Sequence, residues 1–225
     1  WQRMSDRIGY WADMEHPYIT YDDNYIESVW WAIRQMADKG LLYKGYKIVP
    51  YCPRCGTALS SHEVAQGYKD VEETSVFVKF PVKGMEKTYF LAWTTTPWTL
   101  SSNTALCMNG DEDYTRIEVD GEFYILADAL IDKVFEGKEY RKIDTKKGKD
   151  YEYAEYEPLF DYKYDFKEKA YFIVNDGYVT LTDGTGIVHI APAFGEDDGR
   201  VGKKYGLPFI QMVDDRGNFK DAVTD

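Results

Sequence analysis

The chain is poor in cysteine, has no long apolar run and carries fewer basic than acidic residues. Three cysteines, an odd number, argue against a disulfide framework and favour a reducing, cytoplasmic compartment. No apolar run approaches the 18 residues or so that a transmembrane helix needs, so we expect no membrane contact. Lys and Arg number 27 against 39 Asp and Glu, a formal net charge of −12. This balance argues against a protein that grips long stretches of nucleic acid through phosphates, but it is compatible with contact to one nucleic-acid end.

The first 45 residues predict helix. An apolar stripe recurs at helical spacing, and Gly40 is a typical helix stop. The stripe comprises Ile26, Val29, Trp30, Ile33 and Met36. We place a domain boundary after residue 70, so that residues 1–70 form a helical segment with half a zinc knuckle and residues 71–225 a separate domain. Because the chain opens on Trp1 and stops at Asp225 without a terminating signal, we expect a piece of a larger protein.

From Ser75 onward the residues favour strands, and the predicted fold is mainly β with α, a barrel-like domain. Asp120-Gly121 is a two-residue hairpin signal between two of these strands. A second turn, Asn175-Asp176-Gly177, is expected between segments 170–174 and 178–182. The other predicted strands are 75–80, 88–94, 114–119, 122–127 and 187–190, with helices at 127–135 and 195–205 (closed by Gly206) and a solvated loop at 142–150.

Three consecutive threonines, Thr94 to Thr96, leave a predicted strand and meet Pro97. Pro97 cannot donate a ladder hydrogen bond and favours extended geometry at Thr96, so the strand ends here. Hydroxyl groups at this exit can hold a water or a sugar oxygen without adding charge. Threonine is also common in strands, and the residues alone favour an ordinary strand end.

A second segment, GTGIVHIAPAFGEDD, runs from Gly184 to Asp198. His189 lies in an apolar run, where a lone histidine more often packs in a core than acts in catalysis. Asp197 and Asp198 fall where a helix should begin, and such carboxylates more often complement the helix dipole. The alternative is a carboxylate that pairs with a substrate ammonium in a partly dry pocket. Gly184-Thr185-Gly186 lacks the following Gly-Lys of a phosphate loop.

A single Cys-x-x-Cys pair, Cys52 and Cys55, is the one candidate metal site. A structural zinc takes four ligands, and one pair supplies two. We therefore predict half of a zinc knuckle that is completed outside this chain, with weak or absent metal occupancy here. A redox role is less favoured, because no thioredoxin-like βαβ pattern surrounds the pair.

Taken together, WTTTPWT at residues 93–99 and GTGIVHIAPAFGEDD at residues 184–198 resemble the editing domain of class I aminoacyl-tRNA synthetases. The second motif is similar to the isoleucyl family, since valyl and leucyl relatives typically carry His-Asp where this chain has Phe194-Gly195. The segment from Tyr51 to Tyr68 is also similar to the isoleucyl family. The resemblance covers essentially the whole chain, and two long motifs at compatible separation are highly specific.

The resemblance implies an editing insertion in a larger cytoplasmic synthetase that ligates isoleucine to its tRNA with ATP. The parent's His-Ile-Gly-His and Lys-Met-Ser-Lys-Ser signatures are absent from residues 1–225, so we expect no productive ATP use here. The implied reaction is hydrolysis of valine from tRNA(Ile), with valyl-adenylate as a second substrate. It requires no cofactor, whereas ATP and zinc belong to the parent. Implied partners are the valine-carrying 3′ end of tRNA(Ile) and the parent's catalytic and anticodon-binding domains.

The resemblance also implies roles for individual residues. The catalytic residues would be Thr95, Thr96 and Asp198: the threonines position the terminal adenosine and the attacking water, and Asp198 pairs with the valine ammonium. His189 would border the side-chain pocket and reject isoleucine by its bulk. The remaining substrate-binding residues would be Thr94 in support, Trp98 as an apolar wall and Asn103 as a hydrogen-bonding group. The alternatives are a non-hydrolytic module that binds the tRNA end, from the same or from a valyl or leucyl synthetase, and a structural zinc-knuckle interaction domain.

Overall fold

The protein is described from a computed structural model that covers residues 1–45, 47–162 and 165–223. By its internal contacts the chain divides into two units, Trp1–Lys47 and Ile48–Asp225. Residues 48–70, which the sequence analysis grouped with the helical segment, thus cluster with the strands that follow them. The two units are described separately below.

The first unit holds two helices, α1 (Gln2–Ile8) and α2 (Asp23–Asp38). The helical prediction is confirmed for these segments and wrong for residues 10–22, which connect them without helix. Gly40 adopts a left-handed φ of 69° just after α2, which confirms the predicted stop. None of the described residues of this unit is buried, and the apolar stripe of α2 is exposed except for the half-buried Ile33.

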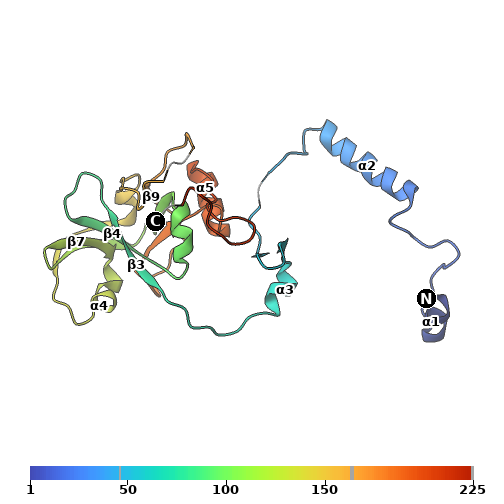
Figure 1. Ribbon diagram of the computed structural model, residues 1–225, viewed down its shortest axis with the longest axis horizontal. Coiled ribbons are helices and arrows are strands. Elements are labelled where there is room, and N and C mark those ends of the chain that lie inside the picture. Colours follow the sequence, from blue (N-terminus) through green and yellow to red (C-terminus); the bar gives the residue numbers. More distant parts are fainter. Residues whose placement is uncertain (46, 163–164, 224–225) are drawn as a thin grey trace. The chain divides into compact units, whose positions relative to one another are not determined.

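The second unit contains a five-stranded sheet in the order β3-β4-β7-β6-β8. Figure 1 labels β3, β4 and β7 of this sheet. The neighbours β4 and β7 are parallel, and the other three neighbouring pairs are antiparallel. The strands are β3 (Val76–Pro81), β4 (Thr88–Thr94), β6 (Asp113–Val119), β7 (Glu122–Ala127) and β8 (Arg141–Lys147). Asp120 and Gly121 both have positive φ, 52° and 81°, as a two-residue hairpin requires, so that prediction is confirmed.

A three-stranded sheet in the order β10-β5-β9 completes the β structure. Its middle strand β5 (Ala105–Met108) is buried along its whole length. It pairs antiparallel with β10 (Ile187–Ile190) and parallel with β9 (Phe172–Asn175). The turn predicted at Asn175-Asp176-Gly177 is present, with turn geometry at residues 177–178. The segment predicted after it is wrong, because residues 178–182 form no strand and β9 takes β5 as its partner.

The predicted loop at residues 142–150 is also wrong, since β8 and the 3-10 helix η3 (Gly148–Tyr151) occupy it. These lysine-rich residues form an edge strand through an antiparallel backbone ladder with β6, and cross-strand ion pairs support it. Arg116 pairs with Asp144, 2.5 Å apart, and Glu118 pairs with Arg141. Gly148 is required where η3 begins, because a Cβ there would lie 2.1 Å from the carbonyl oxygen of Asn109.

Short helices close the unit. The predicted helix at 127–135 is realised as the 3-10 helix η2 (Asp128–Leu130) followed by α4 (Ile131–Val134). The helix predicted at 195–205 is α5 (Glu196–Tyr205), which ends at Gly206 with φ 65°. The other elements are η1 (Pro97–Ser102), α3 (Ser61–Ala65) and the small hairpin β1 (Tyr51–Cys52) and β2 (Thr57–Ala58).

The main core lies between the two sheets. Phe80, Phe90 and Tyr114 of the larger sheet pack with Leu106 and Ile187 of the smaller one, all of them buried. Apolar burial of this kind contributes about 25 cal/mol per Å² of surface removed from water, so the two sheets stabilise each other. The predicted fold class, mainly β with α, is confirmed.

Candidate functional site

One cavity of about 220 Å³ lies where the exit of β4, the end of β10 and the start of α5 meet. Its polar side chains come from all three segments, and its apolar ones are Trp93, Val188 and Phe194. The lining residues are Trp93, Thr94, Thr96, Thr99, Val188, His189, Phe194, Gly195 and Asp198. Two motifs that lie about ninety residues apart in the sequence thus build a single site.

Hydrogen bonds of the threonines shape the exit of β4. The Thr94 hydroxyl accepts the backbone N–H of Thr96 at 3.0 Å and lies 3.3 Å from the Thr96 hydroxyl. The Thr99 hydroxyl donates to the Thr96 carbonyl at 2.8 Å. Side-chain bonds of this kind give the backbone an alternative to the strand ladder, and Pro97 then starts η1. The strand therefore ends with two hydroxyl groups on the cavity.

His189 forms a buried polar part of the cavity wall, with only 6% of its surface exposed. Its Nε2 lies 2.9 Å from the Thr99 hydroxyl oxygen. Because that hydroxyl already donates to Thr96, the bond is satisfied when Nε2 carries the proton and donates. Nδ1 then has no hydrogen-bond partner within the described ranges. Burial lowers the pKa of His189 to about 4, so the ring is neutral at pH 7.

Asp198 places a carboxylate in the cavity from the first turn of α5. Its Oδ2 accepts the backbone N–H of Ala191 at 3.0 Å, and no hydrogen bond to Oδ1 is seen in the described part of the chain. Burial raises the pKa of Asp198 to about 6, the Ala191 N–H opposes that shift, and Asp197 adds to it. Asp197 itself pairs with Arg200 at 2.9 Å on the exposed side of the helix. The two neighbouring carboxylates therefore have different surroundings.

Of the predicted site residues, Thr94, Thr96, His189 and Asp198 line the cavity, whereas Thr95, Trp98 and Asn103 do not. Thr95 is exposed. Trp98 is 45% exposed and meets the lining residue Phe194 edge to face, with ring centroids 5.1 Å apart.

Asn103 has a structural environment. Its amide nitrogen donates to the carbonyl of Ala105 at 2.9 Å, and its amide oxygen accepts the hydroxyl of Tyr156 at 2.6 Å. Only 4% of its surface is exposed, and these bonds hold the end of η1 against β5 and the buried Tyr156. The structure thus gives Asn103 internal partners and no place on the cavity.

Five lining residues had no assigned role in the binding site: Trp93, Thr99, Val188, Phe194 and Gly195. All five lie inside the two motifs quoted from the sequence, so the motifs located them. The sequence did not show that their side chains point into the cavity, because the regular alternation of side chains breaks down at a strand end and at a helix start.

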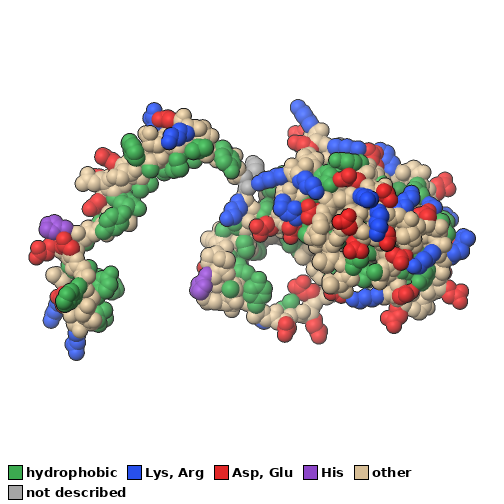
Figure 2. Space-filling model, turned by 180° about the vertical axis from the view of Figure 1, so that it is seen from behind, with side chains coloured by type: hydrophobic (Ala, Val, Ile, Leu, Met, Phe, Trp, Pro, Cys, Tyr) green, Lys and Arg blue, Asp and Glu red, His purple; other side chains and the backbone are tan. Residues whose placement is uncertain are grey.

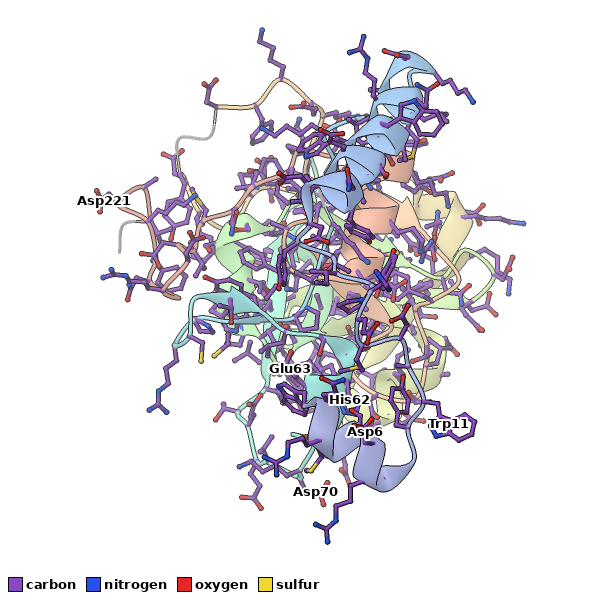
Figure 3. The ribbon with its side chains drawn as sticks, turned by 90° about the vertical axis from the view of Figure 1, so that its right-hand side faces the viewer. Asp6, Trp11, His62, Glu63, Asp70 and Asp221 are labelled. Carbon is purple, nitrogen blue, oxygen red and sulfur yellow. The ribbon has the colours of Figure 1, made fainter. Side chains whose placement is uncertain are left out.

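Cys52 ends strand β1 of the small hairpin and Cys55 lies in the turn before β2, and neither lines the cavity. The backbone N–H of Cys55 lies 3.4 Å from Cys52 Sγ, and this donor lowers the pKa of the Cys52 thiol. His62 of α3 is labelled in Figure 3, and its Nε2 lies 2.9 Å from the side-chain nitrogen of Gln66. Among the described residues no three His, Cys, Asp or Glu side chains are grouped as a metal site, so two thiols do not fit a complete zinc site. The half-site stays a prediction.

Comparison with known proteins assigns this sequence to a family. The family model for class I tRNA synthetases (I, L, M and V) matches residues 1–183. The chain belongs to this family. An isoleucine–tRNA ligase of Clostridium novyi is 59% identical over 224 residues, which are 100% of this chain and 21% of that protein. The corresponding ligase of Picrophilus torridus is 50% identical over 223 residues, which are 99% of this chain and 22% of that protein.

This class I synthetase chain thus spans about a fifth of the length of the curated relatives that it matches. Among solved structures, the editing domain of the P. knowlesi cytosolic leucyl-tRNA synthetase is 12% identical, with a TM-score of 0.46. That similarity covers 59% of this chain and 64% of the other. No helix in the described ranges is long and apolar enough to span a membrane.

Proposed function

We propose that this chain is the editing domain of an isoleucine-specific class I synthetase and hydrolyses valine from mischarged tRNA(Ile). The family match and the identity to isoleucine–tRNA ligases support the parent's specificity. The resemblance of residues 93–99 and 184–198 to editing motifs supports the reaction. Both motifs contribute to one cavity. Hydrolysis of valyl-adenylate in the same cavity belongs to this proposal.

The observation that carries the proposal is the Asp198 carboxylate in the same cavity as the Thr94 and Thr96 hydroxyls. A carboxylate in a partly dry pocket pairs strongly with an ammonium group, and Oδ1 of Asp198 is available for that contact. The hydroxyl groups can hold the attacking water and the terminal ribose. An aminoacyl ester is already activated, so positioning these groups supplies much of the acceleration. Thr95 is exposed and does not line the cavity, so we assign it only a contact with the terminal adenosine.

Specificity requires that valine enter and isoleucine stay out. One methylene is worth only about 1–3 kcal/mol in a hydrophobic pocket, a figure for which this synthetase family is itself the established example. A second pocket that excludes the larger side chain therefore complements the first. His189 suits the wall of such a pocket, because its bond to Thr99 holds the ring in place. With its pKa near 4 it is a weak base, which favours the wall over proton transfer.

The direct test is deacylation of valyl-tRNA(Ile) by the chain and by Asp198→Ala. We expect the variant to lose at least about a hundredfold in rate, because the ammonium partner is gone while the fold is kept. Asp197→Ala is the matched control, since that neighbouring carboxylate pairs with Arg200 outside the cavity. Equal rates for Asp198→Ala and the parent chain would remove Asp198 from the reaction.

A second candidate function is a module that binds the tRNA end without hydrolysis. The net charge of −12 disfavours tight binding of tRNA phosphates. A chain that holds the tRNA end only weakly would have little hydrolytic activity of its own. On the face in Figure 2, acidic and basic side chains are interspersed over the β-rich unit. Binding of a valyl-adenosine analogue without release of valine from valyl-tRNA would favour this second function.

The remaining assignments concern the whole synthetase. We propose that the other domains of a longer parent deliver the tRNA end and supply ATP-dependent aminoacylation. Zinc in the parent would be held by Cys52, Cys55 and ligands from elsewhere. A cytoplasmic location stays a prediction.

A further inference from the structure

Gly195 occupies the N-cap of α5 without supplying a capping side chain. Its φ of −133° and ψ of 142° are extended values that any residue adopts. Glycine is itself common at N-caps, but serine, threonine, aspartate and asparagine also bond the free N–H groups of the first turn through their side chains, which glycine cannot do. The backbone conformation therefore gives no reason for glycine here.

The space around Gly195 supplies that reason. A Cβ at this position would lie 2.9 Å from Cγ of Asp198 and 3.1 Å from each of its carboxylate oxygens. These three atoms are the nearest ones to that position, and all belong to the same carboxylate. The Asp198 carboxylate thus stands where the side chain of an N-cap residue would begin.

In that place the carboxylate reaches back to the backbone N–H of Ala191 at 3.0 Å. Gly195 and Asp198 both line the cavity. A methyl group at residue 195 would push the carboxylate aside, away from the Ala191 N–H and from its present place on the cavity. Because the displaced atoms are the end of a flexible side chain, the helix itself has no need to move.

We infer that Gly195 is a positioning residue, whose missing side chain makes room for the Asp198 carboxylate to bind the α-ammonium group of the aminoacyl ester. The inference rests on the proposed function. It assigns to Gly195 a share in recognising the amino group, separate from the sieving of the side chain.

The test measures binding of two non-hydrolysable analogues. One is the valyl amide of 3′-amino-3′-deoxyadenosine, and the other replaces its α-ammonium by a hydroxyl group. We expect the chain to prefer the ammonium analogue and Gly195→Ala to lower that preference at least about tenfold, as loss of a charged hydrogen bond does. Gly177→Ala is the matched control, because no atom lies within 4 Å of its added Cβ, and it should keep the preference.

A double variant separates positioning from general damage. If Gly195 acts through Asp198, then Gly195→Ala adds no further loss of preference in an Asp198→Ala background. The thermal midpoint of Gly195→Ala should stay close to that of Gly177→Ala.

Three outcomes would overturn the inference. Gly195→Ala that keeps the preference, while Asp198→Ala loses it, refutes the inference and leaves the proposed function standing. Equal weakening of both analogues by Gly195→Ala assigns the glycine a structural role only. Retention of the preference by Asp198→Ala removes the ammonium contact itself and the inference with it, and it counts against the proposed site.

Discussion

Residues 1–47 and residues 48–225 use apolar side chains in opposite ways. Helix α2 carries a regular apolar stripe, yet Trp30 is 66% and Met36 45% exposed. In the second unit Phe80, Leu106 and Tyr114 are completely buried between two sheets. The periodicity of apolar residues therefore predicts where a helix forms, but it does not predict what that helix packs against. The unit that buries its apolar residues also builds a cavity from distant segments.

The largest effect that this comparison predicts is on stability. Leu106→Ala should lower the free energy of unfolding of the second unit by about 2–5 kcal/mol, because it leaves a hole between the sheets. Met36→Ala should change it by no more than about 0.5 kcal/mol, as expected of an exposed position. Urea unfolding followed by circular dichroism measures both. Similar losses for the two variants would break the contrast between the units.

A smaller effect is predicted on specificity. His189→Ala enlarges the cavity, so isoleucyl-tRNA(Ile) should be hydrolysed about 10–200 times faster relative to valyl-tRNA(Ile) than by the unaltered chain. The ratio of the two deacylation rates is the measurement. His62→Ala is the control, because this histidine, labelled in Figure 3, lies on α3 and does not line the cavity. Continued rejection of isoleucyl-tRNA would refute the sieving role.

The smallest effect is on the pH dependence of stability. The pKa of Asp198 is raised from 3.8 to about 6 by burial, so the folded chain binds its proton more tightly than the unfolded chain does. Stability therefore falls as pH rises through the window from about 4 to 6. Asp198→Asn has no proton to lose, and at pH 7 it should be more stable than the parent chain by roughly 1–3 kcal/mol.

The measurement is the difference in unfolding free energy between pH 4 and pH 7 for both proteins. Asp197→Asn lacks this gain, because the Asp197 carboxylate is exposed and pairs with Arg200. A stability gain at pH 7 that equals the gain at pH 4 would show that the Asp198 carboxylate carries no burial cost.

Local signals predicted those elements whose residues decide the structure by themselves. The hairpin at Asp120-Gly121, the strands at 88–94, 122–127 and 187–190 and the helix that ends at Gly206 were all predicted from short patterns. The errors at 142–150 and 178–182 have a common cause. Strand β8 pairs along its backbone with β6, and β9 pairs with a parallel partner more than sixty residues earlier in the chain.

The sequence by itself determined the family motifs, the mainly β composition and the residue types that could carry editing chemistry. Only the tertiary structure decided which of those residues meet. Thr96, His189 and Asp198 line one cavity because β4, β10 and α5 converge there, whereas the Asn103 amide turns to Ala105 and Tyr156. The burial that raises the pKa of Asp198 and the space that Gly195 leaves for its carboxylate are both products of packing between distant segments. No short stretch of sequence contains that packing.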